Sequence, residues 1–262
     1  MRITIFQQTT FEPDDSRFVL FCHKLQEGTL VLLPEYVLTP FFTQLCDLSM
    51  QTLAKNCNAQ LTFLKTLAKK YGLYFVAPLV MISDNKPYKQ IIYINPESKT
   101  PRYYTQQRLI AYEHWNEASF FANPRCQRFK DPLIINLNNL KIAMLFGFEI
   151  HFDEIWYRLK KRGVDVVLLP SANTFDSCVR WRELCKMRAF LNGCALVRAN
   201  RVGQCDVGGQ NWEFYGDSLI AMPNGEILDH LGQSAESLSI KLTYTQIEQM
   251  AKEWGFRENF SK

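Results

Sequence analysis

The chain has 262 residues, of which 47% are hydrophobic, and its 30 basic and 26 acidic residues give a formal charge of +4. This length and composition predict one domain over residues 1–262 with a large core. The charges are interspersed, without the lysine- or arginine-rich run that is typical of nucleic-acid-binding and membrane-surface proteins. We therefore expect no nucleic acid partner.

Eight cysteines are scattered along the chain without a C-x-x-C pair. No Cys and His spacing would build a zinc site, and no glycine-rich phosphate loop is present, so we expect no metal and no cofactor. The N-terminal residues turn acidic too soon for a signal peptide, and no apolar run approaches the ~20 residues of a membrane span. These features predict a cytoplasmic protein with reduced thiols and no membrane contact.

The first half of the chain alternates between strand and helix patterns. The run TLVLL at 29–33 suits a strand that is buried on both faces, and it stops at Pro34 with Glu35 directly after it. The expected elements, in order, are a strand at 2–6, a helix between Asp14 and Gly28, a strand at 29–33, a helix at 51–70, and a hairpin of strands at 74–83 and 89–94.

The second half follows an irregular stretch at about 107–131 and mixes strands and helices in the same way. Because no linker or repeat divides the chain, the pattern fits an α+β fold in which two mixed sheets pack face to face with helices outside. The expected elements are strands at 133–136 and 140–146, a helix at 153–162, a strand at 165–169, a helix at 178–192, strands at 195–199, 218–222, 227–231 and 237–242, and a helix at 244–254.

Six short segments stand out by their order and spacing. They are LLPE at 32–35, LKIAMLFGFEIHFDE at 140–154, VLLPSAN at 167–173, ANR at 199–201, FYGDS at 214–218 and PNG at 223–225. Together they resemble the carbon-nitrogen hydrolase (nitrilase-like) superfamily over nearly the whole chain. The resemblance implies a four-layer α-β-β-α sandwich.

The resemblance also implies a chemistry. Such enzymes cleave amides or nitriles with a cysteine thiolate, a glutamate that moves its proton and a lysine that stabilises the oxyanion. Glu35 matches the glutamate that acts as general base. Aligning FDE at 152–154 places Gly147 at the nucleophile position, followed by Phe148 and Glu149 as pocket candidates. The nucleophile is therefore expected to be missing.

The lysine position of the family falls on Gln106, three residues before a leucine, so the lysine is expected to be missing too. Glu113 is the candidate for the family's second glutamate, with Glu117 close by. If Glu35 and Glu113 share a pocket without a cation, like-charge repulsion should raise one pKa. Arg108 lies two residues beyond Gln106 on the same side of a strand and is a further pocket candidate.

Two missing side chains favour a catalytically degenerate homologue that acts as a small-molecule binder or regulatory subunit, with an amide-like ligand. The alternative is an active amidohydrolase that cleaves a small linear amide or carbamoyl compound through Glu35, Glu113 and either Cys178 or His151. Cys178 is the one cysteine expected on a loop at the pocket rim. A third hypothesis is a structural partner, because the resemblance implies a homodimer formed through the helices at 153–162 and 178–192.

The pocket itself depends on loops whose conformation the sequence leaves open. Ligand specificity is expected to come from residues 36–50, 114–131 and 172–178. Five aromatic side chains could fill the pocket: Phe146, Phe148, Trp115, Phe120 and Phe121.

Overall fold

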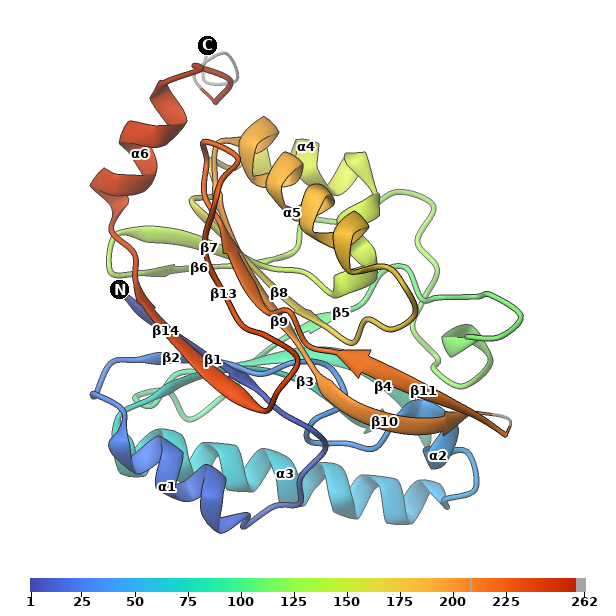
Figure 1. Cartoon of the computed structure of the whole chain (residues 1–262). Helices are drawn as coiled ribbons and strands as arrows, with labels where there is room; N and C mark the ends of the chain where they lie inside the picture. The colour runs from blue at the N-terminus through green and yellow to red at the C-terminus, as the bar shows by residue number, and fades with distance from the viewer. Residues whose placement is uncertain (208, 258–262) are drawn as a thin grey trace.

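The structure is a computed structural model that describes residues 1–207 and 209–257. Two six-stranded sheets lie face to face, and a helical layer covers the outer face of each (Figure 1). The chain is therefore the α+β, four-layer α-β-β-α sandwich that the sequence predicts. Among the described residues, no helix is long and apolar enough to cross a membrane.

The first sheet has the order β14-β1-β2-β3-β4-β5. Its parallel centre consists of β1, β2 and β3, while β4, β5 and β14 pair antiparallel with their neighbours. The bounds are Arg2–Gln7 (β1), Leu30–Leu32 (β2), Tyr74–Ser83 (β3), Lys86–Ile94 (β4), Arg102–Thr105 (β5) and Glu236–Lys241 (β14).

The second sheet has the order β13-β12-β9-β8-β7-β6, and β7, β8 and β9 are parallel. A separate two-stranded ribbon, β10 and β11, extends from this half of the molecule. The bounds are Leu133–Leu137 (β6), Leu140–Met144 (β7), Val166–Ser171 (β8), Ala195–Asn200 (β9), Val202–Val207 (β10), Gln210–Tyr215 (β11), Leu219–Ala221 (β12) and Ile227–His230 (β13).

The helices form the two outer layers. In Figure 1, α1 and α3 lie below the first sheet, α4 and α5 lie above the second, and α6 projects near the C-terminus. The bounds are Ser16–Lys24 (α1), Phe42–Leu45 (α2), Met50–Tyr71 (α3), Asp153–Lys161 (α4), Cys178–Asn192 (α5) and Tyr244–Lys252 (α6), with 3-10 turns at Glu117–Ser119 (η1) and Gly147–His151 (η2).

Strand β2 shows why the chain buries a continuous apolar run. Leu32 points into the core between the sheets, whereas Val31 and Leu33 point outward and pack under α1 and α3. Successive side chains of a strand face opposite sides, so a central strand that is covered on both faces needs apolar residues throughout. The strand ends at Leu32, and Glu35 lies three residues later, beyond the carboxyl end of this central strand.

The expected elements agree with the structure to within a few residues at their ends. The sequence analysis did not predict α2 or the ribbon β10 and β11, and it left residues 107–131, which contain η1, as irregular. The ribbon was missed because its two strands are short, mostly polar and only partly buried, so the stretch resembles a loop in composition.

Candidate functional site

The site begins where the parallel strands of the two sheets end. The backbone N–H of Glu35, just after β2, donates to the carbonyl of Ser171 at the end of β8 (3.3 Å), so the two sheets meet at this edge. The Glu35 side chain is buried, and its Oε1 accepts the backbone N–H of Gly147 (3.3 Å). Glu35 and Gly147, which the sequence assigns to one site, therefore lie in contact.

Lys89 supplies a cation that the sequence analysis missed. Its Nζ forms ion pairs with Glu35 and with Glu117 (2.5 Å to Oε1 of Glu117). The ammonium also lies over the rings of Tyr36 (4.8 Å) and Phe146 (5.1 Å). The expectation of two carboxylates without a cation is therefore wrong.

The strand pattern carried a signal for Lys89. In β4, Ile91 and Tyr93 face the core between the sheets, and Lys89 is two residues before Ile91 on the same face. A lysine is almost never fully buried unless it is paired. A lysine in the inward register of a strand therefore indicates buried partners, even though its position differs from the family's lysine position.

The second carboxylate is Glu117 rather than Glu113. Glu113 is exposed and does not line the cavity, because the turn around residues 112–115 directs it to solvent. Glu117 is fully buried on η1 and accepts hydrogen bonds from the Tyr36 hydroxyl (2.6 Å) and from Lys89. One ammonium thus bridges two buried carboxylates.

The charges of this cluster affect one another. Burial raises the pKa of Glu35, Lys89 opposes the rise, and the negative charge of Glu117 adds to it. Burial alone would lower the pKa of Lys89, but the charges of Glu117 and Glu35 outweigh burial and raise it. Lys89 therefore stays protonated, and Glu35 takes up a proton more readily than an exposed carboxylate.

Tyr36 orients this cluster at some conformational cost. Its φ of 58° lies in the left-handed region, which is rare for a bulky residue. Three contacts hold it there: its carbonyl accepts from the Thr10 hydroxyl (2.8 Å) and the Arg201 guanidinium (3.0 Å), and its hydroxyl donates to Glu117. Backbone strain that is held in place by several contacts is found preferentially at functional sites.

Gly147 leaves little room for a side chain. A Cβ on Gly147 would lie 2.7 Å from Cβ of Ser171 and 3.3 Å from Oε1 of Glu35. Ser171 is held in place, since its hydroxyl donates to the carbonyl of Ala199 or the side chain of Asn200 (3.2 Å each). Ser171, the last residue of β8, therefore fills the space beside Glu35.

Glu149 lies beneath the site rather than in it. Its carboxylate is buried and accepts from the N–H groups of Gln107 (2.7 Å) and Phe146 (3.1 Å) and from the Tyr104 hydroxyl (2.9 Å). Burial raises the pKa of Glu149 to about 7, although these donors oppose the shift. The residue ties η2 to the end of β5 and does not line the cavity.

Gln106 and Arg108, which follow β5 in the chain, also point away from the cavity. Gln106 is buried and donates to the carbonyl of Arg108 (2.8 Å), and its Oε1 has no partner among the described residues. The Arg108 guanidinium packs over the Phe129 ring (4.2 Å) instead of reaching Glu35. Neither side chain contacts Glu35, and the cation beside Glu35 is Lys89 from the neighbouring strand β4.

A cavity of about 440 Å³ opens above Glu35 and Lys89. Phe148 and Trp115 line it, whereas Phe146, Phe120 and Phe121 do not, so these aromatic residues do not close it. The segments 114–131 and 172–178 contribute walls, as expected, but 36–50 does not. The lining residues are Glu35, Lys89, Ile110, Tyr112, His114, Trp115, Phe148, His151, Ala172, Asn173, Thr174, Phe175, Ser177, Arg180 and Trp181.

Aromatic rings form part of the cavity wall, since five of its 15 lining residues are Phe, Tyr or Trp and two are His. Phe148 packs against Tyr112 and His151, and His151 packs edge-on against Trp181. A larger hollow of about 720 Å³ lies between the β6–β7 turn and α6, but it contains none of the expected site residues. Within the described chain, no group of three or more His, Cys, Asp or Glu side chains could hold a metal ion.

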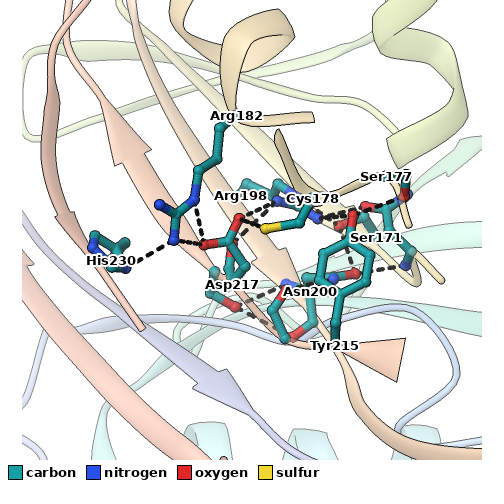
Figure 2. Close-up of polar contacts among 12 residues, drawn as sticks. Ser171, Ser177, Cys178, Arg182, Arg198, Asn200, Tyr215, Asp217 and His230 are labelled. Atoms are coloured by element: carbon teal, nitrogen blue, oxygen red, sulfur yellow. Dashed lines mark hydrogen bonds and ion pairs between the residues drawn. The ribbon is translucent and has the colours of Figure 1, made fainter. Parts of the chain in front are cut away.

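Cys178 belongs to a polar network behind the cavity wall. Figure 2 shows its thiol directed at Asp217, with Sγ 3.3 Å from Oδ2, and the same carboxylate binds Arg182 and Arg198. Burial and the contact with Asp217 raise the pKa of the Cys178 thiol. Because Cys178 does not line the cavity, it does not join the candidate site.

This network positions one wall of the cavity. The Arg198 guanidinium is fully buried and donates to Oδ1 of Asn173 (2.8 Å), which lines the cavity. Asn200 accepts the backbone N–H of Asn173 (2.7 Å) through its side chain. The order of these residues is visible in the sequence, but their convergence is not, because it depends on β8 and β9 being adjacent in the sheet.

One protein-family model matches nearly the whole chain. The model of the carbon-nitrogen hydrolase family matches residues 8–255. The chain belongs to the carbon-nitrogen hydrolase family. An N-carbamoylputrescine amidase from Solanum tuberosum is 24% identical over 204 residues, covering 73% of this chain and 67% of that protein.

Solved carbon-nitrogen hydrolase structures share the fold. A carbon-nitrogen hydrolase from Helicobacter pylori G27 superposes with a TM-score of 0.82 and 17% identity, covering 99% of this chain and 94% of that one. A variant of an amidase from Nesterenkonia sp. AN1, with acrylamide added to its active-site cysteine, has a TM-score of 0.77 and 21% identity, with 99% coverage of both chains. At these identities the likeness concerns the fold.

Proposed function

We propose that this carbon-nitrogen hydrolase homologue is catalytically degenerate and binds a small amide-like carbonyl compound without cleaving it, as a single domain over residues 1–262. The observation that carries the proposal is Gly147. It lies against Glu35 where the sequence alignment places the nucleophile, has no side chain, and faces Ser171 across a gap too small for a Cβ. Losing a nucleophile costs on the order of a millionfold in turnover.

The rest of the site supports binding. Glu35 offers an acceptor and Lys89 a donor on the floor of a cavity whose volume falls within the ~300–1,000 Å³ of ligand pockets. The aromatic walls suit a flat apolar body. These features support a role as a ligand sensor or regulatory subunit, and the eight free cysteines fit the reducing cytoplasm.

One observation favours a second function, hydrolysis through an unorthodox site. The cluster of Glu35, Lys89 and Glu117 keeps a base and a cation together. The two nucleophiles considered for it fit less well, because Cys178 is outside the cavity and His151 Nδ1 lies 2.9 Å from the carbonyl of Phe148. Water activated by Glu35 would have to serve instead.

A panel of amides, carbamoyl amines and nitriles separates the two functions. We expect no ammonia release from the native protein, while at least one amide raises its melting temperature. Glu35→Ala should abolish that thermal shift, and Cys178→Ala should leave it unchanged, because only Glu35 lines the cavity. Ammonia release that disappears in Glu35→Ala would contradict the proposed loss of catalysis.

We also propose a homodimer formed through α4 and α5. Three apolar side chains on α5 are exposed: Val179 (73%), Met187 (43%) and Leu191 (49%). Residues 187 and 191 lie four apart and share one face of the helix, and position 179 lies about 80° from position 187 around the helix axis. An exposed apolar stripe of this kind is typical of an interaction surface.

Sedimentation tests the dimer. The native chain is expected to be dimeric at micromolar concentration, and Met187→Glu should shift it to monomer because a charge would be buried in the interface. Leu20→Glu is the matched control, since Leu20 is 51% exposed on α1 at the opposite side of the sandwich. A native monomer, or dissociation by both variants alike, would contradict an α4–α5 interface.

A further inference from the structure

Phe175, on the loop between β8 and α5, has an unusual backbone conformation. Its φ of 61° lies in the left-handed region, which is rare for a bulky residue because Cβ crowds the backbone there. Among the described residues, eight besides glycine have such a φ, and six of them are Asp or Asn, the types that tolerate it. The other two are Tyr36, beside Glu35, and Phe175, so both belong to the candidate site.

Contacts on both sides of Phe175 hold it in this conformation. Before it, Thr174 forms a β-bridge to Phe214 of β11, and its hydroxyl donates to the carbonyl of Glu213. After it, the N–H of Ser177 donates to the carbonyl of Phe175 (2.9 Å), and the hydroxyl of Ser177 donates to the carbonyl of Thr174 (2.7 Å). Backbone strain that the surroundings impose in this way is found at ligand clamps as well as at active sites.

The strained residue places an aromatic ring on the cavity wall. Phe175 lines the cavity, and 53% of its surface is exposed, although its ring packs against Trp212 (4.9 Å between centroids) and His114 (5.7 Å). A half-exposed phenyl ring contributes only part of the stabilisation of a buried one. Packing alone therefore does not account for a bulky residue at a position where glycine would be unstrained.

Other rings extend this wall away from Phe175. In order of contact, they are His114, Tyr112 (5.9 Å from His114) and Phe148 (6.0 Å from Tyr112). Phe175 and Phe148 line the same cavity of about 440 Å³, but among the described residues their rings make no contact with each other. The cavity can therefore admit a planar group against Phe175 without displacing Phe148.

We propose that Phe175 determines the specificity of the cavity, and that its ring selects amides with a planar aromatic group over amides of similar size with a saturated group. This inference rests on the proposed function, since it names the class of amide that the site holds. The amide group lies near Glu35 and Lys89, and its aromatic ring lies against Phe175, in a complex without a covalent bond. Aromatic pairs attract each other beyond the burial of their area, which corresponds to up to about tenfold in affinity.

Calorimetry with benzamide and cyclohexanecarboxamide tests the inference, because these two amides are similar in size and differ in whether the ring is planar and aromatic. On the native chain, we expect benzamide to bind up to about tenfold more tightly. Phe175→Gly should bring the ratio of the two affinities close to one by weakening benzamide alone. Phe175→Tyr keeps the ring and should preserve the ratio.

The same position separates a role in binding from a role in the fold. Glycine adopts the left-handed conformation without strain, whereas alanine retains the strain, so Phe175→Gly should melt at a higher temperature than Phe175→Ala. Both variants lack the ring and should lower the ratio of affinities alike. If the ring only stabilised the loop, the two amides would lose affinity together, and the loss would follow the melting temperature.

The outcomes distinguish this inference from the proposed function. Equal affinity of the native chain for the two amides, or a ratio that Phe175→Gly leaves unchanged, overturns the role of Phe175 and leaves the proposed function standing. Failure of both probes to bind at millimolar concentration, when another amide of the panel binds, has the same meaning. If no amide of the panel binds, both fail. Ammonia release from benzamide by the native chain overturns the proposed function itself.

Discussion

A thiol at position 147 is expected to create amide hydrolysis only when Ser171 is shortened in the same variant. Gly147→Cys alone should stay silent, because its Cβ would approach Cβ of Ser171 to 2.7 Å. Gly147→Cys with Ser171→Gly removes that contact and leaves the Ser171 Cα at 3.2 Å, which a small backbone shift relieves. The double variant would then hold a thiol beside Glu35 and Lys89.

The reason is space and not backbone conformation. The φ of Gly147 is not among the positive values, so an L-residue suits the backbone there. A nucleophile accounts for a rate factor on the order of a millionfold, so even a poorly placed thiol should raise ammonia release above the background. Lys89, on β4, would supply the positive charge that stabilises the oxyanion.

Ammonia release from the amide panel measures the effect, and peptide mapping after iodoacetamide treatment shows whether residue 147 carries a reactive thiol. Gly147→Ala with Ser171→Gly is the matched control, because it opens the same space without sulfur and should be silent. Equal turnover by the single and double variants would show that Ser171 does not restrict the site.

The sequence predicted the architecture well because burial follows the strand and helix periods. The run at 29–33, the helix at 51–70 and the β7 segment have patterns that depend on local spacing alone, and these elements form the layers in which the site is set. Glu35 was assigned to the site through the resemblance of the segment LLPE to the family's strand-end glutamate, and its place is fixed by one element, the buried strand that precedes it.

The site was harder to predict than the fold, because the positions of its residues other than Glu35 depend on contacts between segments that are distant in the sequence. Glu117 and Glu113 lie in one irregular stretch, and only the packing of η1 against Tyr36 distinguishes the buried carboxylate from the exposed one. Lys89 was missed because the resemblance places the family's lysine position at Gln106. The two residues are neighbours across β4 and β5, as the bond from the Gln106 N–H to the Lys89 carbonyl shows (3.2 Å).

Removing the lysine from this cluster is expected to have the largest effect on stability. Lys89→Met leaves Glu35 and Glu117 buried without a cation, and breaking a buried ion pair from one side typically costs about 3–5 kcal/mol of unfolding free energy. The methionine fills most of the volume, so the loss reflects charge more than a cavity. Urea unfolding at pH 8 measures it.

The loss should depend on pH in a direction that the charges determine. Burial already raises the pKa of Glu35 and Lys89 opposes the rise, so without Lys89 the folded-state pKa of Glu35 lies further above its unfolded value of about 4. The folded state then holds protons that the unfolded state releases, so its stability falls as the pH rises from about 4 through the folded-state pKa. The destabilisation by Lys89→Met should therefore be small at pH 5 and fully present at pH 8.

A second substitution distinguishes charge from packing. Adding Glu117→Gln to Lys89→Met removes one of the two unpaired charges, so the double variant should be more stable at pH 8 than Lys89→Met alone, a non-additivity expected for residues in contact. Lys86→Met, at an exposed position of the same strand, should change the unfolding free energy by no more than about 0.5 kcal/mol. If Lys89→Met unfolds like the native chain at pH 8, then Lys89 is not the cation that allows Glu35 and Glu117 to be buried side by side.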